Sequence, residues 1–379
     1  MSISLLSGMA RATALTRAGK LMEATAELQR NLTGYSEVPA TDAPIASDHD
    51  VVEGVFSVVE SAAPKTDKFS PKPRKPLGET LRDIARGGMP EQGRPVDRAP
   101  ANDTHFTVHH HNGPDGSRDY MLFVPSPLPT SPCPVVMMLH GCTQSPQDFA
   151  NGTGMNDLAQ AQGVIVVYPA QPTGANMNKC WNWFRPADQA RGAGEPAILA
   201  AITRGVVASQ NADPSRVYVA GLSAGGAAAV LLALAYPDIF AAVGVHSGLA
   251  AGAAQDVGSA FAAMRNGAQG TSAQHPVPTI VFHGTADATV HLSNAHAVAA
   301  QAQKGLTGTA RTTKGKVSKG RGYSRTTLTQ NERTMGEVWL IDGAGHAWAG
   351  GSNLGSYTDP TGPNASAEML RFFAQHRRN

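Results

Sequence analysis

The 379-residue sequence has little of what marks membrane, nucleic-acid-binding or disulfide-rich proteins. It contains no run of 18 apolar residues, so we expect no transmembrane helix. The formal net charge is only +2, which gives no global attraction to nucleic acid or to an acidic membrane surface. Its three cysteines are too few for a disulfide scaffold, and their spacing is not that of a zinc site. With 41% hydrophobic and 16% charged residues, the composition is typical of a soluble globular enzyme of one large domain with additions.

The N-terminal segment also lacks the features of an export signal. Its apolar part, residues 3–9, is interrupted by Ser4, Ser7 and Gly8, and no positive charge precedes it. Export by the ordinary route is therefore not indicated, and a cytoplasmic location is favoured.

Three regions differ in composition. Residues 1–35 predict a helical hairpin, because apolar residues recur close to a 3.6-residue period, as at Leu21, Ala24, Leu28 and Leu32. Such a pair of helices buries little by itself, so an accessory role is favoured over a docking module that contacts a polymer granule or a protein. Residues 36–104 are rich in proline and charge and predict a largely disordered linker.

Residues 105–379 predict a catalytic domain of the α/β class. A hairpin is expected at 105–111 and 118–124, around a turn of Asn, Gly, Pro and Asp residues. Apolar runs typical of buried parallel strands follow, at 134–140, 164–168, 216–220, 241–246, 279–283 and 337–341. Helical segments alternate with these runs, at 155–162, 196–209, 226–236 and 365–376. This alternation predicts a mostly parallel sheet with helices on both faces.

The clearest motif is Gly-x-Ser-x-Gly, with Gly221, Ser223 and Gly225, between a predicted strand and a predicted helix. A serine at the tip of such a sharp turn needs small neighbours, and glycine provides them. The motif alone is weak in a chain with 40 glycines, but its place between strand and helix predicts a nucleophile.

A serine nucleophile needs a histidine base and an acid that orients this base. Asp287 follows the predicted strand 279–283 on a glycine-containing turn, and His346 follows the last predicted strand between glycine-rich neighbours. The order Ser, Asp, His, each after a strand, is that of the α/β-hydrolase fold. We therefore predict the triad Ser223, Asp287 and His346.

Other acids and histidines compete for these roles. Asp342 lies so near its strand that support of the loop is favoured, and Asp238 is expected to be a cap or turn residue. His283 is expected to be structural, and His246 lies too near the serine motif to follow the acid. If His291 or His296 were the base, the loop of His346 would have no catalytic role. The run 109–111 has the composition of a metal site, but alternate side chains of a strand point apart, so a hairpin surface is favoured.

The tetrahedral intermediate of acyl transfer needs two hydrogen-bond donors for its oxyanion. One is expected to be the backbone N–H of Ala224, directly after the nucleophile. The other is expected from the loop after the strand that ends in His140 and Gly141, where Cys142 is the candidate. His140 is also a candidate for contact with substrate.

Substrate binding is expected from a loop with an unusual aromatic run, Cys180-Trp181-Asn182-Trp183-Phe184. Trp181 or Trp183 could line an apolar groove, and packing in the core is an equally good interpretation of each. Cys180 could pair with Cys142, although in a reducing cytosol the two would be thiols.

The segment 304–325 carries Lys and Arg but no acid, and we expect a solvated, mobile face. A site for phosphate or a polyanion has no further support in the sequence.

Together, five motifs resemble the short-chain polyhydroxyalkanoate (polyhydroxybutyrate) depolymerase family of esterases, which is similar to microbial feruloyl and acetylxylan esterases. They are Leu139-His140-Gly141-Cys142-Thr143-Gln144, Cys180-Trp181-Asn182-Trp183-Phe184, Gly221-Leu222-Ser223-Ala224-Gly225-Gly226, His283-Gly284-Thr285-Ala286-Asp287 and Gly345-His346. The resemblance covers residues 105–375. It implies an α/β-hydrolase fold, the same triad, an oxyanion contact from Cys142, and a Cys142–Cys180 bridge in exported members.

The sequence thus predicts a serine esterase that needs neither cofactor nor metal. Poly(3-hydroxybutyrate) or its oligomers are the expected substrates, and feruloyl or acetylated cell-wall esters are the alternative. A hypothesis of another class is a non-catalytic protein that binds granules or a partner through the N-terminal hairpin.

Overall fold

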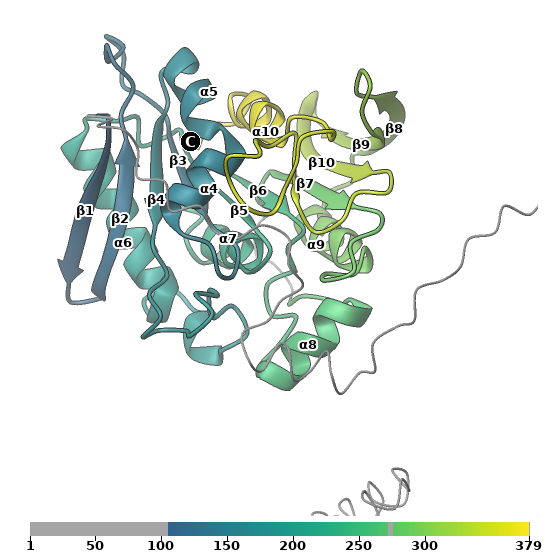
Figure 1. Cartoon of the computed structure of the whole chain (residues 1–379), viewed down its shortest axis with the longest axis horizontal. Helices are drawn as coiled ribbons and strands as arrows, with labels where there is room; N and C mark the ends of the chain where they lie inside the picture. Colours follow the sequence, from purple (N-terminus) through teal and green to yellow (C-terminus); the bar gives the residue numbers. More distant parts are fainter. Residues whose placement is uncertain (1–104, 272–275, 379) are drawn as a thin grey trace, which may run out of the picture. The chain divides into compact units, whose positions relative to one another are not determined.

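The computed structural model describes residues 105–271 and 276–378 (Figure 1). The expected helical hairpin at 1–35 and linker at 36–104 lie outside the described residues. Within the described part, no helix has the length and apolar character needed to cross a membrane.

A mixed ten-stranded sheet forms the centre of the domain, with the strand order β1-β2-β4-β3-β5-β6-β7-β10-β9-β8. Its strands are β1 Phe106–Gly113, β2 Gly116–Phe123, β3 Val135–Leu139, β4 Ile165–Pro169, β5 Val217–Leu222, β6 Ala242–His246, β7 Thr279–Gly284, β8 Thr309–Lys316, β9 Gly322–Gln330 and β10 Arg333–Ile341. Six neighbouring strands run parallel to one another: β4, β3, β5, β6, β7 and β10. The hairpin β1–β2 extends the sheet next to β4, and the hairpin β8–β9 extends it next to β10, both through antiparallel pairs. The carboxyl ends of the parallel strands therefore meet at one edge.

Helices cover both faces of this sheet (Figure 1). The helices are α4 Pro146–Thr153, α5 Met155–Gln162, α6 Gly194–Ser209, α7 Ala224–Ala235, α8 Val257–Asn266, α9 Ser293–Gln303 and α10 Ala365–Phe373. Alternate residues of the buried strands belong to two separate cores: Val217 and Val219 pack with α6, α7 and α9, while Tyr218 and Ala220 pack with α4, α5 and α10. The period of two along each strand thus divides one sheet between two helical layers.

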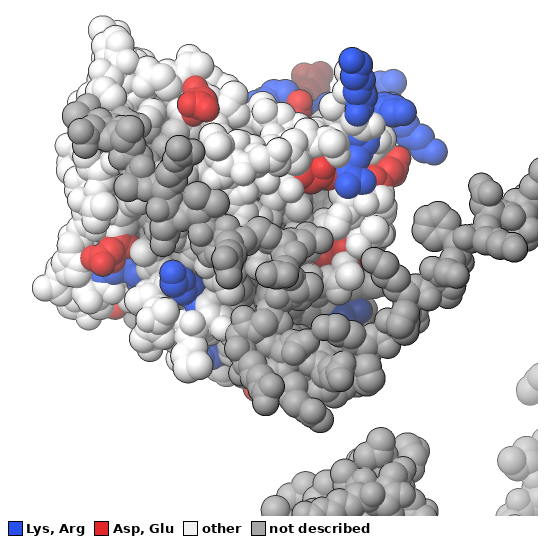
Figure 2. Space-filling view, viewed as in Figure 1, with Lys and Arg blue, Asp and Glu red and all other residues white. Residues whose placement is uncertain are grey.

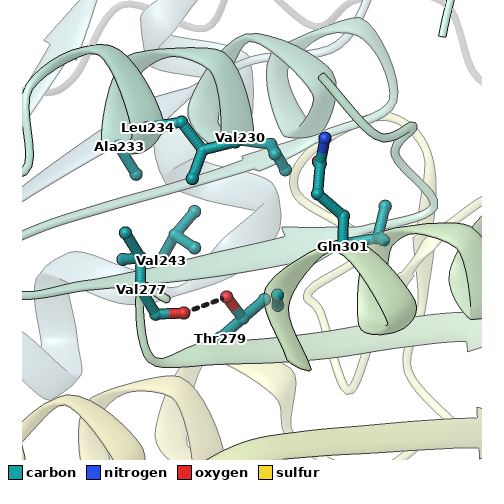
Figure 3. A pocket seen from close by; sticks show the side chains of 9 residues that line it. Val230, Ala233, Leu234, Val243, Val277, Thr279 and Gln301 are labelled. Atoms are coloured by element: carbon teal, nitrogen blue, oxygen red, sulfur yellow. Dashed lines mark hydrogen bonds between the residues drawn. The ribbon is translucent and has the colours of Figure 1, made fainter. Parts of the chain in front are cut away.

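These layers are tightly packed. Figure 3 shows a small apolar gap between α7, α9, β6 and β7, where the Thr279 hydroxyl donates a hydrogen bond of 2.7 Å to the Val277 carbonyl. The cavity volume is about 10 Å³, which at most equals that of one water probe. This gap is part of the core rather than a binding site.

The predicted α/β-hydrolase fold is confirmed, but the prediction for segment 304–325 is partly wrong. Its side chains are largely exposed, as expected, yet its backbone forms β8 and the start of β9 instead of a mobile loop. Threonine is β-branched and favours strands, and β9 completes its hydrogen bonds on β10. Figure 2 shows the Lys and Arg side chains gathered over this end of the sheet, and those exposed on it include Arg311, Lys314, Lys316 and Lys319.

Candidate active site

Ser223 stands at the sharp turn between β5 and α7, with φ 58° and ψ −121°. This backbone conformation is strained for a residue with a side chain, and such strain concentrates at functional sites. The turn also requires glycine on both sides. A Cβ atom on Gly225 would lie 2.1 Å from the Leu139 carbonyl oxygen, and one on Gly221 would lie 2.4 Å from the backbone of Gly225. The sequence motif is therefore explained by close contact of the turn with β3.

His346 and Asp287 lie on the loops after β10 and β7, which are parallel neighbours. The Nδ1 atom of His346 is 2.8 Å from the Oδ2 atom of Asp287. The other carboxylate oxygen accepts hydrogen bonds from the amides of Thr289 at 2.9 Å and Val290 at 2.8 Å. Burial alone would raise the pKa of Asp287, but the hydrogen bond from His346 and the neighbouring donors lower it to about 2. Asp287 is thus an ionised, fixed acceptor for the His346 ring.

Ser223 and His346 meet at a small pocket, which is also lined by Cys142 and Tyr357. Ser223 is only 8% exposed, and its hydroxyl makes no hydrogen bond to any residue that the structure describes. The reaction needs a hydrogen bond from this hydroxyl to His346, and such catalytic bonds often tighten only when substrate is bound.

The competing residues have other partners. Asp342 is exposed, and Asp238 forms an ion pair with Arg191 at the surface. The Nε2 atom of buried His283 lies 2.8 Å from the Val290 carbonyl oxygen, and that of buried His246 accepts a hydrogen bond of 3.0 Å from the amide of Ala349. Both rings therefore hold the backbone of the loops around the candidate triad.

The other histidines that competed for a role at the site lie at or near the surface. His291 and His296 are exposed, and neither is among the residues that line the pockets at Ser223. His110 and His111 contact Asp119 and Asp115 on the β1–β2 hairpin. No group of three metal-binding side chains occurs in residues 105–271 or 276–378.

Two backbone amides point to an oxyanion hole. Ala224 is the first residue of α7, so helix geometry leaves its N–H without an intrahelical acceptor. In the loop after β3, the amide of Gly141 donates to the Gln144 side chain at 2.9 Å and that of Thr143 donates to the Asn178 carbonyl at 2.7 Å. The amide of Cys142, between them, has no acceptor among the described residues. Both unengaged amides belong to residues that line the pockets at Ser223.

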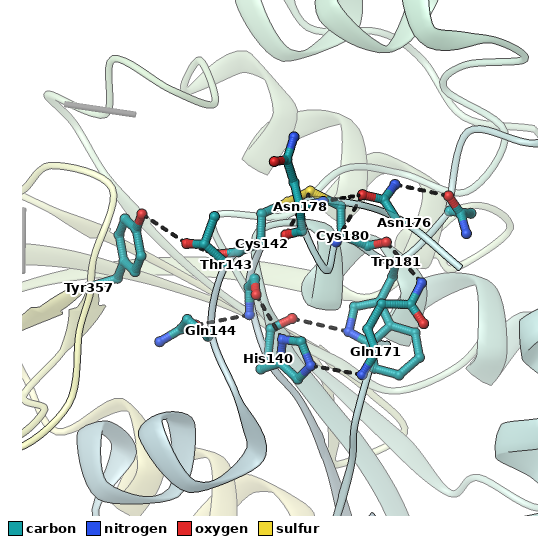
Figure 4. The surroundings of a disulfide bond; sticks show 12 residues. His140, Cys142, Thr143, Gln144, Gln171, Asn176, Asn178, Cys180, Trp181 and Tyr357 are labelled. Atoms are coloured by element: carbon teal, nitrogen blue, oxygen red, sulfur yellow. Dashed lines mark hydrogen bonds between the residues drawn. A yellow bond between two sulfur atoms is a disulfide. The ribbon is translucent and has the colours of Figure 1, made fainter. Parts of the chain in front are cut away.

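A disulfide joins Cys142 to Cys180 (Figure 4). It connects the loop after β3 with the loop after β4, and both cysteines line the larger of the two pockets at Ser223. The disulfide therefore links the candidate oxyanion loop covalently to the wall of that pocket. The third cysteine, Cys133, is free and buried.

The larger pocket is an apolar cavity of about 270 Å³ beside Ser223. Its apolar walls include Trp183, Phe184, Leu249, Ala260, Phe261 and Met264. The polar side chains of Asn176 and Asn178 lie at the same cavity. Such a combination of apolar walls and few polar groups is typical of a small-molecule site.

The prediction that Trp181 and His140 contact substrate is not supported by their positions. Trp181 is fully buried in the core and its Nε1–H donates to the His140 carbonyl at 3.1 Å, whereas Trp183 lines the cavity. His140 is 1% exposed and is not among the residues that line the cavity. The chain enters a turn at Trp183, so the two tryptophans face different surroundings although they stand only two residues apart. The pattern of residue types does not reveal this turn.

Tyr357 and helix α8 are parts of the site that sequence reasoning missed. Tyr357 has φ 53°, and its hydroxyl lies 3.3 Å from the Thr143 hydroxyl. Helix α8 supplies Ala260, Phe261 and Met264 to the cavity. No motif marks Tyr357, and the amphipathic pattern of α8 could have indicated a helix but not its place over the serine.

The sequence matches the family described as Esterase PHB depolymerase over residues 118–320. This segment is more than half of the chain and includes the serine turn and the acid. The chain belongs to this family. Its strands, helices and serine turn are those expected of a family of α/β-hydrolase esterases.

Several curated relatives are similar to parts of the chain. Poly(3-hydroxyalkanoate) depolymerase C of Paucimonas lemoignei is 37% identical over 193 residues, which cover 47% of this chain and 46% of the relative. Feruloyl esterase B of Neurospora crassa is 36% identical over 140 residues, which cover 37% and 46%. The match thus spans about half the length of these relatives. Among solved structures, an acetyl xylan esterase from Aspergillus awamori has a TM-score of 0.57 at 19% identity, covering 71% of this chain and 99% of its own. That likeness shows the fold.

Proposed function

We propose that residues 105–379 form a serine hydrolase that cleaves carboxylic esters. The observation that carries this proposal is the contact of His346 with Asp287, facing a pocket shared with Ser223. Ser223 Oγ attacks the ester carbonyl carbon while its proton passes to His346, and the charge of the carbonyl oxygen is held by the amides of Ala224 and Cys142. His346 then gives this proton to the departing alcohol, and water attacks the acyl-enzyme in the same way.

The two pockets suggest how an ester lies at Ser223. The leaving oxygen must be within reach of His346, because this residue protonates it. The small pocket contains His346 and Tyr357, whereas the apolar cavity contains neither. The alcohol part therefore leaves on the side of Ser223 that faces His346, and the acyl part occupies the cavity.

This arrangement favours esters with an acyl part larger than acetyl, since an acetyl group would leave most of a 270 Å³ cavity unfilled. We propose poly(3-hydroxybutyrate) or its oligomers as the substrate, in keeping with the depolymerase of Paucimonas lemoignei among the relatives. Feruloyl esters are the second candidate, because Trp183, Phe184 and Phe261 give the cavity aromatic walls.

Replacement of the nucleophile tests the reaction. We expect Ser223→Ala to lose hydrolysis of p-nitrophenyl butyrate while its far-ultraviolet circular dichroism stays that of the parent. Turnover retained by the folded variant would exclude the proposed mechanism. Clearing of poly(3-hydroxybutyrate) film, compared with release of ferulate from methyl ferulate, then separates the two substrate candidates.

A further inference from the structure

His140 makes two hydrogen bonds that together allow only one state of its ring (Figure 4). Its Nδ1 atom lies 2.8 Å from the carbonyl oxygen of Gly141, which can only accept. Its Nε2 atom lies 3.1 Å from the amide of Gln171, which can only donate. The ring must therefore be neutral, with its proton on Nδ1. Burial lowers the pKa of His140 to about 4, against the opposing effect of the Gly141 bond, which agrees with a neutral ring.

The carbonyl that His140 contacts belongs to the same peptide group as the candidate oxyanion donor, the N–H of Cys142. A hydrogen bond to a peptide oxygen polarises the group and strengthens its N–H as a donor, because hydrogen bonds in a chain reinforce one another. The bond from His140 also limits rotation of the Gly141–Cys142 peptide plane, and the Gln144 side chain holds the preceding amide. The direction of the Cys142 N–H is thus set from behind by the His140 ring.

The loop after β4 holds His140 in this place. Trp181 Nε1–H donates to the His140 carbonyl at 3.1 Å, and Gln171 contacts the ring. The buried carboxylate of Glu195 accepts a hydrogen bond of 2.8 Å from the amide of Asn182 and another from the Gln171 side chain. The loop and His140 therefore form one hydrogen-bonded unit.

We infer that His140 is a positioning residue of the esterase reaction: its Nδ1–H orients and polarises the Gly141–Cys142 peptide so that the Cys142 amide binds the oxyanion. This inference rests on the proposed function. His140 touches neither substrate nor Ser223, and it acts only through the peptide next to it.

Two variants separate the two bonds of the ring. In His140→Asn the side-chain NH₂ can take the place of Nδ1–H, whereas in His140→Gln the amide extends to the place of Nε2 and the bond to Gly141 is lost. Loss of a whole oxyanion donor costs about 10²–10³ in kcat, so a weakened donor in His140→Gln is expected to cost roughly tenfold or more. We expect His140→Asn to stay within about threefold of the parent and KM for p-nitrophenyl butyrate to change little in both.

Affinity for butylboronic acid supplies a second measurement, because its tetrahedral adduct with Ser223 places an oxygen in the oxyanion hole. We expect this affinity to fall in His140→Gln by the same factor as kcat. If His140 had only a structural role, both variants would change KM and thermal stability, and by similar amounts. Equal impairment of His140→Asn and His140→Gln, or full kcat in a folded His140→Gln, would overturn the inference.

Nuclear magnetic resonance of the unmutated protein tests the inference even if both variants fail to fold. Imidazole ¹⁵N shifts at pH 7 should show a neutral His140 with its proton on Nδ1. A proton on Nε2 would contradict the inference, since the Gly141 carbonyl would then have no donor. This result does not depend on activity, so its failure is distinguishable from failure of the Ser223→Ala test.

Discussion

The Nδ1 atom of His346 lies 2.8 Å from the Oδ2 atom of Asp287, whose other oxygen is held by two backbone amides. Because Asp287 is fixed from one side, its second oxygen can orient the His346 ring from the other. We predict that Asp287→Asn lowers kcat by on the order of 10³- to 10⁴-fold, since an amide no longer selects the required tautomer.

The matched control for this experiment is Asp342→Asn. Asp342 stands four residues before His346 but is exposed, so this variant should keep kcat within about twofold. Steady-state hydrolysis of p-nitrophenyl butyrate measures both variants. A larger loss of kcat in Asp342→Asn than in Asp287→Asn would show that Asp287 is not the acid of the triad.

The apolar cavity should set the limit on acyl length. Ala260 lies on α8 and lines the cavity, so Ala260→Leu adds bulk there. We predict a fall in kcat/KM of roughly tenfold for p-nitrophenyl octanoate, since one or a few methylenes in an apolar pocket change binding by about 1–3 kcal/mol. The acetate ester should be almost unaffected.

Ala262→Leu serves as the control, because Ala262 is an exposed residue of the same helix and does not line the cavity. It should preserve the ratio of octanoate to acetate turnover. If Ala260→Leu also preserved that ratio, the acyl part would have to bind elsewhere.

Buried histidines should make the fold sensitive to mild acid. Burial lowers the pKa of His140 and of His376 to about 4 and that of His246 to about 3, against 6.5 for an unburied ring. Below pH 6.5 these rings bind protons in the unfolded chain, but they stay unprotonated in the folded state until the pH approaches 4. Their contribution is therefore fully present above pH 6.5 and is lost as the pH falls toward 4, at about 1.4 kcal/mol per pH unit for each ring.

His376 offers a test away from the active site, since its ring packs on Phe372 at 4.5 Å between centroids. We predict that His376→Phe reduces the loss in the free energy of unfolding between pH 6.5 and 5 by about 2 kcal/mol, as measured by urea titration. His296→Gln, at an exposed position, should leave the pH dependence unchanged. The idea fails if both variants lose stability with acid as steeply as the parent.

Much of this architecture could be predicted because strong local signals coincide with the order of elements. Helix α5 has the predicted bounds, and the positions of Ser223, Asp287 and His346 after β5, β7 and β10 follow from the chain order of the fold. Parallel strands bring their carboxyl ends to one edge, which is why loops 123 residues apart in sequence can meet at one pocket.

Other parts depend on tertiary contacts that leave no signal in the residue types. The direction of Trp181 and Trp183 is decided by whether each side chain meets His140 or the cavity. The positive φ of Tyr357 is likewise imposed by the surrounding structure, because a bulky residue does not favour it by itself. In β8, charge suggested a loop, although its threonines and the open edge of β9 determine a strand.

The two antiparallel hairpins at the ends of the sheet have a consequence for self-association. The outermost strands of the sheet are β1 and β8, and an open strand edge is a template for pairing with another chain. β1 carries three histidines in succession, and β8 carries Arg311, Lys314 and Lys316 on a largely exposed strand. Charged and polar side chains on an edge strand oppose its pairing with an edge strand of another molecule. The hairpins thus limit growth of the sheet at both ends and protect its apolar parallel strands from aggregation.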